Sequence, residues 1–141
     1  MTVITRACPV TILQVESAGD GTAGTAASVE LPTAHTILLV EMPVAGHQGI
    51  KLPEGSVGDL AEIFVLSGTT TGANPRLHIY DAEDNRIAQT DNTGALNSNE
   101  SIVARKIFSA PYSAPGGHDS SFLGTWLCAA PQIRSNYPPT T

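Results

Sequence analysis

The chain has 141 residues, which is enough for one domain with a sizeable hydrophobic core and too short for two comfortable ones. Charged residues make up only 14% of the sequence, against about 25% in a typical soluble domain, so the surface is easily desolvated and suits burial against a partner. The net charge is −6 and the seven basic residues are scattered, with Arg105-Lys106 the only adjacent pair. This distribution excludes a nucleic-acid role, because phosphate binding needs clustered lysine and arginine.

The sequence also gives expectations about location and redox state. Its first residues lack the basic region and apolar run of a signal peptide, and its longest apolar run, residues 37–40, is too short to span a bilayer. We therefore expect that the chain is made in a cytoplasm and does not associate with a membrane. Cys8 and Cys128 stand near opposite ends of the chain in no metal-binding spacing, so we expect two reduced thiols.

Short β-branched and apolar segments, separated by turn residues, recur along the chain. Residues 17–24 are polar and glycine-rich and predict a loop. Residues 102–108 favour a strand or a single helical turn. In chain order, we predict strands at residues 10–15, 27–31, 36–42, 60–66, 76–80, 86–89 and 122–129.

Two of these strands carry information about burial. Residues 36–42 are almost continuously apolar, which is typical of a strand buried on both faces, although a short helix has the same pattern. Residues 76–80 alternate, with Leu77 and Ile79 on one face and His78 on the polar face, where we expect it to meet solvent. Residues 81–85 predict a turn that joins this strand to residues 86–89 in a hairpin.

The spacing of strands, about 8–12 residues, and the lack of any long helical periodicity predict one all-β domain. We expect an antiparallel β-sandwich or a barrel-like fold of jelly-roll or β-tulip type. Residues 1–35 would form an N-terminal segment or arm with one or two strands, residues 36–130 the core, and residues 131–141 an extended tail.

No pattern predicts catalysis or metal binding. The four histidines, at positions 35, 47, 78 and 118, lack the spacing of a helical metal pair, and no serine lies in a Gly-x-Ser-x-Gly motif. Residues 81–85 offer oxygen ligands for calcium, but without the central glycine and trailing glutamate of a calcium loop they favour a turn. We expect no enzyme activity, no catalytic residue, no metal and no cofactor.

The candidate functional residues are instead aromatic and aliphatic. Trp126 is the only tryptophan, and it either packs in the core near the C-terminal edge or anchors an interface, where tryptophan is enriched. The apolar segments 37–44 and 123–127 carry more hydrophobic surface than a domain with so few charges easily hides, so we expect a homo-oligomer, a trimer or a dimer. The candidate interface residues are Trp126, Tyr112, Tyr137, Ile37 and Leu38.

The order of motifs over the last two thirds of the chain is more specific than any one of them. One strand ends in Leu-Pro and is followed by Gly-Asp and an apolar strand. A turn-rich hairpin comes next, and a strand that contains Gly-x-Trp closes the unit. These motifs are Ile50-Lys-Leu-Pro-Glu-Gly55, Val57-Gly-Asp-Leu-Ala-Glu-Ile-Phe-Val-Leu66, Leu77-His-Ile-Tyr80, Asn85-Arg-Ile87, Ile102-Val-Ala-Arg-Lys-Ile107 and Gly124-Thr-Trp126.

This order resembles the small β proteins of tailed-phage virions, chiefly capsid decoration (cement) proteins and related head or fibre modules. The resemblance implies a structural protein on the capsid surface of a virion, with the major capsid (coat) protein as its partner. Residues 109–119 form an insertion relative to the pattern, and residues 1–35 have no counterpart in it. The alternatives are a tail-fibre or lectin-like receptor-binding module, for which 5% aromatic residues are few, a bacterial surface sandwich, and an enzyme.

Overall fold

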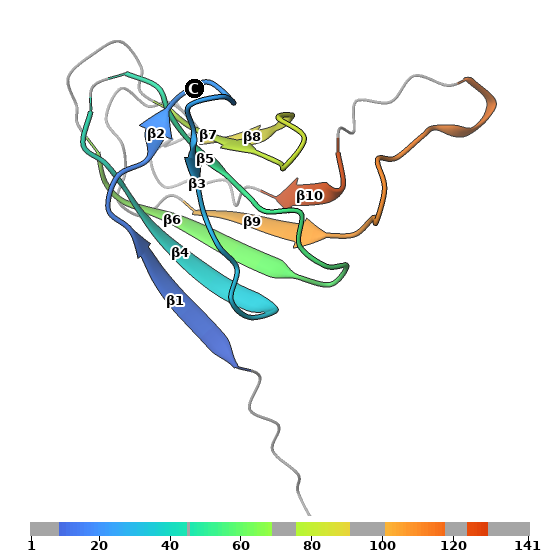
Figure 1. Cartoon of the computed structure of the whole chain (residues 1–141), viewed down its shortest axis with the longest axis horizontal. Helices are drawn as coiled ribbons and strands as arrows, with labels where there is room; N and C mark the ends of the chain where they lie inside the picture. The colour runs from blue at the N-terminus through green and yellow to red at the C-terminus, as the bar shows by residue number, and fades with distance from the viewer. Residues whose placement is uncertain (1–8, 45, 69–75, 91–100, 118–123, 130–141) are drawn as a thin grey trace, which may run out of the picture.

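The structure is a computed structural model that describes residues 9–44, 46–68, 76–90, 101–117 and 124–129 (Figure 1). Several positions discussed above lie outside the described residues, namely Cys8, His118, Tyr137 and the tail 131–141. The described residues form a short 3₁₀ turn, Pro115–Gly117, and the strands β1 (Val10–Val15), β2 (Gly19–Asp20), β3 (Ala27–Ser28), β4 (His35–Met42), β5 (Gln48–Lys51), β6 (Leu60–Gly68), β7 (Leu77–Tyr80), β8 (Arg86–Gln89), β9 (Ser101–Lys106) and β10 (Trp126–Ala129).

The strands form two sheets that face each other, as Figure 1 shows. Sheet A has the order β1-β4-β6-β9-β10, and sheet B has the order β2-β5-β7-β8 with β3 paired to β5. Neither sheet closes into a barrel, so the prediction of an all-β sandwich is confirmed and the barrel-like alternative is not.

The prediction of antiparallel sheets is wrong, because both sheets are mixed. In sheet A, β4 runs parallel to both β1 and β6, while β9 and β10 are antiparallel to their neighbours; in sheet B, β5 and β7 are parallel. The chain passes from β4 in sheet A through β5 in sheet B and back to β6 in sheet A. Because the opposite sheet supplies this crossover, the chain enters β6 in the same direction as β4.

The core lies between the sheets and is built from one face of each strand. β4 alternates strictly between half-buried and buried residues, so the prediction that residues 36–42 are buried on both faces is wrong. Its inward face meets sheet B, and its outward face meets no described element. The largest fully buried side chains are those of Trp126, Leu38, Met42, Ile50, Leu52, Ile63, Leu77, Ile79, Ile102, Gln48, Val40 and Val65.

His78 is buried rather than facing solvent, which corrects the prediction from alternation. All four residues of β7 are buried, because the segment that contains Gly21 contacts the second face of this strand. His78 Nδ1 lies 2.9 Å from the Gly21 carbonyl oxygen, and the Tyr80 hydroxyl donates a hydrogen bond to the same oxygen. The His78 ring also stacks on that of His47, with ring centroids 4.9 Å apart. Loss of hydration lowers the pKa of His78 below its ordinary value of 6.5.

The predicted turn and hairpin at residues 81–89 are confirmed. The fully buried Asp81 carboxylate accepts hydrogen bonds from the backbone N–H groups of Glu83 and Asn85, at 3.0 and 2.9 Å, and from the Asn85 side-chain amide at 3.1 Å. Asp84 adopts a positive φ of 66°, which Asp tolerates in turns. The Asp81 carboxylate thus serves the turn itself, and the Asp84 carboxylate forms an ion pair with Lys51.

Candidate interaction surface

The outward side chains of sheet A form the most unusual surface of the domain. Strand register and alternation place fifteen described residues on this surface, and none of them is buried. We call this set the outer face of sheet A. Its nine apolar members are Val10, Ile12, Ile37, Leu39, Leu60, Phe64, Val103, Leu127 and Ala129, and its six polar members are Gln14, His35, Glu41, Glu62, Ser101 and Arg105.

A sandwich normally places polar residues on the solvent side of its strands. Here an apolar majority extends across all five strands, and none of these apolar residues is buried. Ile12 is 64% exposed and Leu127 is 50% exposed, at opposite edges of the sheet. Large contiguous apolar patches on soluble domains mark interaction sites. The outer face of sheet A is therefore the candidate site for binding a protein partner.

The polar residues within this face are few and partly paired. His35 and Glu62 lie on β4 and β6, and His35 Nε2 is 3.3 Å from Glu62 Oε1. This separation is that of an ion pair, but the geometry is not that of a hydrogen bond, and Nε2 is buried without a hydrogen-bond partner among the described residues. Arg105 is the one basic residue on the face that is always charged. Glu41 and Glu62 are acidic, so a partner surface would meet a small excess of acidic groups here.

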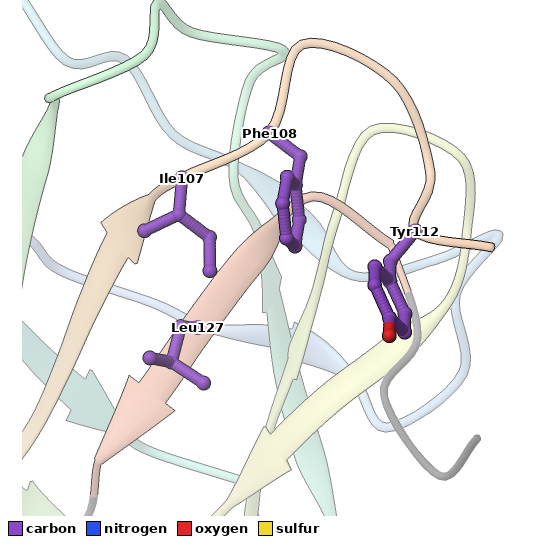
Figure 2. A pocket seen from close by; sticks show the side chains of 4 residues that line it. All are labelled: Ile107, Phe108, Tyr112 and Leu127. Carbon is purple, nitrogen blue, oxygen red and sulfur yellow. The ribbon is translucent and has the colours of Figure 1, made fainter. Parts of the chain in front are cut away.

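An apolar pocket adjoins this face at its β9–β10 edge (Figure 2). Ile107 directly follows β9, and Leu127 projects outward from β10. Phe108 and Tyr112 stack with ring centroids 5.5 Å apart and an interplanar angle of 22°. These four side chains line an open hollow of about 240 Å³, a volume that suits one large side chain of a partner better than a drug-sized ligand of about 300 Å³ or more.

The predicted interface residues divide between this surface and the core. Ile37 lies near the centre of the outer face of sheet A, and Tyr112, which is 42% exposed, lines the pocket. Leu38 and Trp126 are fully buried between the sheets, so they cannot contact a partner in this fold, and core packing is the outcome for Trp126. Leu38 was assigned wrongly because it alternates with Ile37 on one strand. Tyr137 is outside the described residues.

Sequence reasoning missed Ile12, Leu127 and Phe108. For the first two, a signal was present, because each is an apolar residue whose neighbours on the strand point into the core. Once Trp126 is placed in the core, period-two alternation places Leu127 on the opposite face. The position of Phe108 beside Tyr112 has no such signal, because it depends on the conformation of residues 107–114.

The other side chains with reactive or ligating groups point to no second site among the described residues. Lys106 is buried, donates a hydrogen bond of 2.6 Å to Thr125 Oγ1 and lies 5.9 Å from the centre of the Trp126 ring, within the range of a cation–π contact. Burial raises the pKa of the Cys128 thiol to about 12, so it is protonated and a poor nucleophile at neutral pH. Within the described ranges, no group of three or more His, Cys, Asp or Glu side chains could hold a metal ion.

Comparison with known proteins finds no family model, no curated protein and no solved structure that matches the chain. Among the residues that the structure describes, no helix is long and apolar enough to cross a membrane. The resemblance to phage decoration proteins thus depends on the order of sequence motifs alone, and the outer face of sheet A is an independent physical observation beside it.

Proposed function

We propose that the chain is a structural virion protein that decorates and stabilises a phage capsid by binding across neighbouring coat subunits. The observation that carries this proposal is the outer face of sheet A, in which nine of fifteen side chains are apolar. The chain would be made in the host cytoplasm and act on the capsid surface, with the major capsid protein as its partner and more than one copy associated.

The size of this face supports a protein partner. One outward residue covers about 4.8 Å between strands by about 6.8 Å along a strand, so fifteen positions cover about 490 Å² in plan. Side-chain relief and the adjoining pocket enlarge this area toward the approximately 800 Å² that each partner buries in a specific complex. Many copies on a symmetric shell add avidity where each one contacts two coat subunits.

A tail-fibre or lectin-like receptor-binding module is the second candidate, and the stacked Phe108–Tyr112 pair is the observation that favours it. Aromatic rings stack on sugars, but sugar binding also needs polar groups that bond the hydroxyls. The Tyr112 hydroxyl is the only polar side-chain group among the four residues that line the pocket. A decoration role therefore fits this pocket better, with an apolar coat side chain as its occupant.

The test is co-sedimentation of the purified protein with undecorated, expanded capsids of its phage and, separately, with free coat subunits. We expect binding to the capsids with a rise in their melting temperature, and poor binding to free subunits, because the bridging site exists only where two capsomers meet. Leu127→Asp places a charge in the docking surface and is expected to weaken capsid binding at least about tenfold. Val44→Asp is the matched control, since Val44 is 55% exposed and lies outside this face.

Equal binding to capsids and free subunits, or equal effects of the two substitutions, would contradict the proposal. Glycan-dependent binding to host cells, abolished by Tyr112→Ala, would instead support the receptor-binding alternative.

A further inference from the structure

Among the strands that the structure describes, β1 lies at an edge of sheet A (Figure 1). Four of its six residues are aliphatic, yet none of the six is fully buried. Leu13 and Val15 are only partly buried against the core from the inward face, while Val10 and Ile12 are exposed on the outward face. Both faces of this strand therefore leave apolar surface that the described domain does not cover.

The open edge of β1 also lacks the features that natural proteins use to block strand pairing. Proteins protect edges with charged residues, proline or β-bulges. The sequence Val-Thr-Ile-Leu-Gln-Val has no charge, no proline and no glycine, and its register with β4 is unbroken over all six residues. Among the described residues, β4 is the only strand that pairs with β1. This edge is a straight, uncharged template for one more strand.

We propose that a second copy of the chain supplies that strand, with β1 pairing antiparallel to the β1 of its partner across a two-fold axis perpendicular to the sheet. The result is a continuous ten-stranded sheet. Such an isologous contact is the commonest way in which identical subunits associate. An uncharged strand meets its own copy without like-charge repulsion. A second copy is also present wherever the chain is made, whereas a coat surface exists only on an assembled shell.

The two-fold axis restricts the register. It keeps outward residues of one copy opposite outward residues of the other, so the axis passes midway between one residue and its own copy. We place it at Ile12, the most exposed large apolar side chain of the strand. Ile12 then lies opposite its own copy, Val10 opposite Gln14, and Thr11 opposite Leu13. This register continues the apolar row formed by Ile12 and Ile37 into the partner.

The two-fold symmetry would also affect capsid binding, an effect that rests on the proposed function, whereas the dimer itself does not. A two-fold axis perpendicular to the sheet points the outer faces of both copies in the same direction. A dimer would present two coplanar docking surfaces to one shell, and avidity would follow from the geometry without a new contact. The dimer itself requires no capsid and is tested in solution.

Sedimentation equilibrium of the full chain is the first test. The paired strands are about 20 Å long and bury less than the approximately 800 Å² per partner of a standard interface. We therefore expect the average mass to rise with concentration from that of one chain to twice that value. Ile12→Lys places two lysines across the two-fold axis and should leave a monomer at all concentrations. Leu127→Lys is the matched control at the far edge of the same face and should still dimerise.

Disulfide trapping tests the register directly. Directly opposed residues of antiparallel strands have Cα atoms about 4.5–5.5 Å apart, within the range of about 4.4–6.8 Å that a disulfide requires. In a background with Cys8→Ser and Cys128→Ala, Ile12→Cys should form a covalent dimer under mild oxidation many times faster than Leu127→Cys. Circular dichroism of each variant verifies that the β fold is retained.

A wild-type chain that remains a monomer at every concentration, or equal trapping at positions 12 and 127, would overturn the dimer. Capsid binding by a strict monomer would overturn it too while sparing the proposed function. A β1-linked dimer that binds no capsid would have the reverse meaning, since the dimer would stand and the decoration role would fail.

Discussion

Adjacent residues on β4 provide a sharp test of the fold, because Leu38 and Ile37 point to opposite faces of the same sheet. Leu38 is fully buried between the sheets, whereas Ile37 lies half-buried on the outer face of sheet A. We compare Leu38→Ala with Ile37→Ala, two substitutions that each remove three carbon atoms from neighbouring positions. Any difference in the free energy of unfolding then reports the environment rather than the chemistry of the change.

The expected magnitudes follow from burial. Three buried carbon atoms contribute about 2.4 kcal/mol of transfer free energy, and the cavity left in a packed core raises the cost of Leu38→Ala to about 3.5 kcal/mol. Ile37 loses about half of its transfer term and leaves no enclosed cavity, so Ile37→Ala should cost about 1 kcal/mol. With a urea m-value of about 2 kcal/mol/M, the midpoints should fall by roughly 1.8 M and 0.5 M.

The assay uses the single tryptophan of the chain. Trp126 is buried, so its fluorescence reports the exposure of the core during urea unfolding. The comparison belongs at low protein concentration, where self-association does not add to stability. Equal shifts for the two variants, or a larger shift for Ile37→Ala, would refute the placement of β4 between a buried and an open face.

Three further predictions follow from the buried polar groups. Burial, with further contributions from Arg86, His47 and Arg76, lowers the pKa of His78, so the folded protein binds fewer protons than the unfolded protein as pH falls below 6.5. The free energy of unfolding should therefore decline as pH falls from 6.5 through the lowered pKa. His78→Gln should flatten that decline in melting curves measured from pH 7 to pH 4. Asp81→Ala removes the acceptor for two backbone N–H groups and should lower the free energy of unfolding in urea by about 3 kcal/mol. Asp81→Asn keeps one acceptor oxygen and should lower it less. Equal losses for the two variants would contradict the hydrogen-bond arrangement. Burial raises the pKa of the Cys128 thiol to about 12, so this thiol should react slowly in the folded protein. In a Cys8→Ser variant at pH 8, its reaction with a disulfide reagent should be at least about tenfold slower in the folded than in the urea-unfolded protein. Similar rates would show that the thiol is accessible.

Local patterns in the sequence were sufficient for the fold class and for several elements. The β-branched run at residues 10–15 and the segment at residues 86–89 are strands with the predicted bounds. Asp81 initiates the turn that its side-chain chemistry favours. These features depend on contacts between residues close in the chain, so one sequence carries enough information to predict them.

The candidate site was only partly predictable. Ile37 and Tyr112 lie on the candidate interaction surface, whereas Leu38 and Trp126 belong to the core. An apolar strand has two apolar faces, and its residues alone do not state which face meets the opposite sheet. His78 illustrates the same limit, because the carbonyl of Gly21, 57 residues away in sequence, contacts its ring.

The sequence by itself determined that the chain forms short strands rather than helices, since side-chain alternation and turn residues act within a few positions. The tertiary structure alone decided that β4 runs parallel to β1 and β6. It also decided that, within the described part of the chain, the outward side chains of sheet A are not buried and β1 pairs with β4 alone. These properties arise from pairing and packing between distant segments. The path of the chain between the two sheets, and not the residue pattern of any one strand, determines which strands pair with each other.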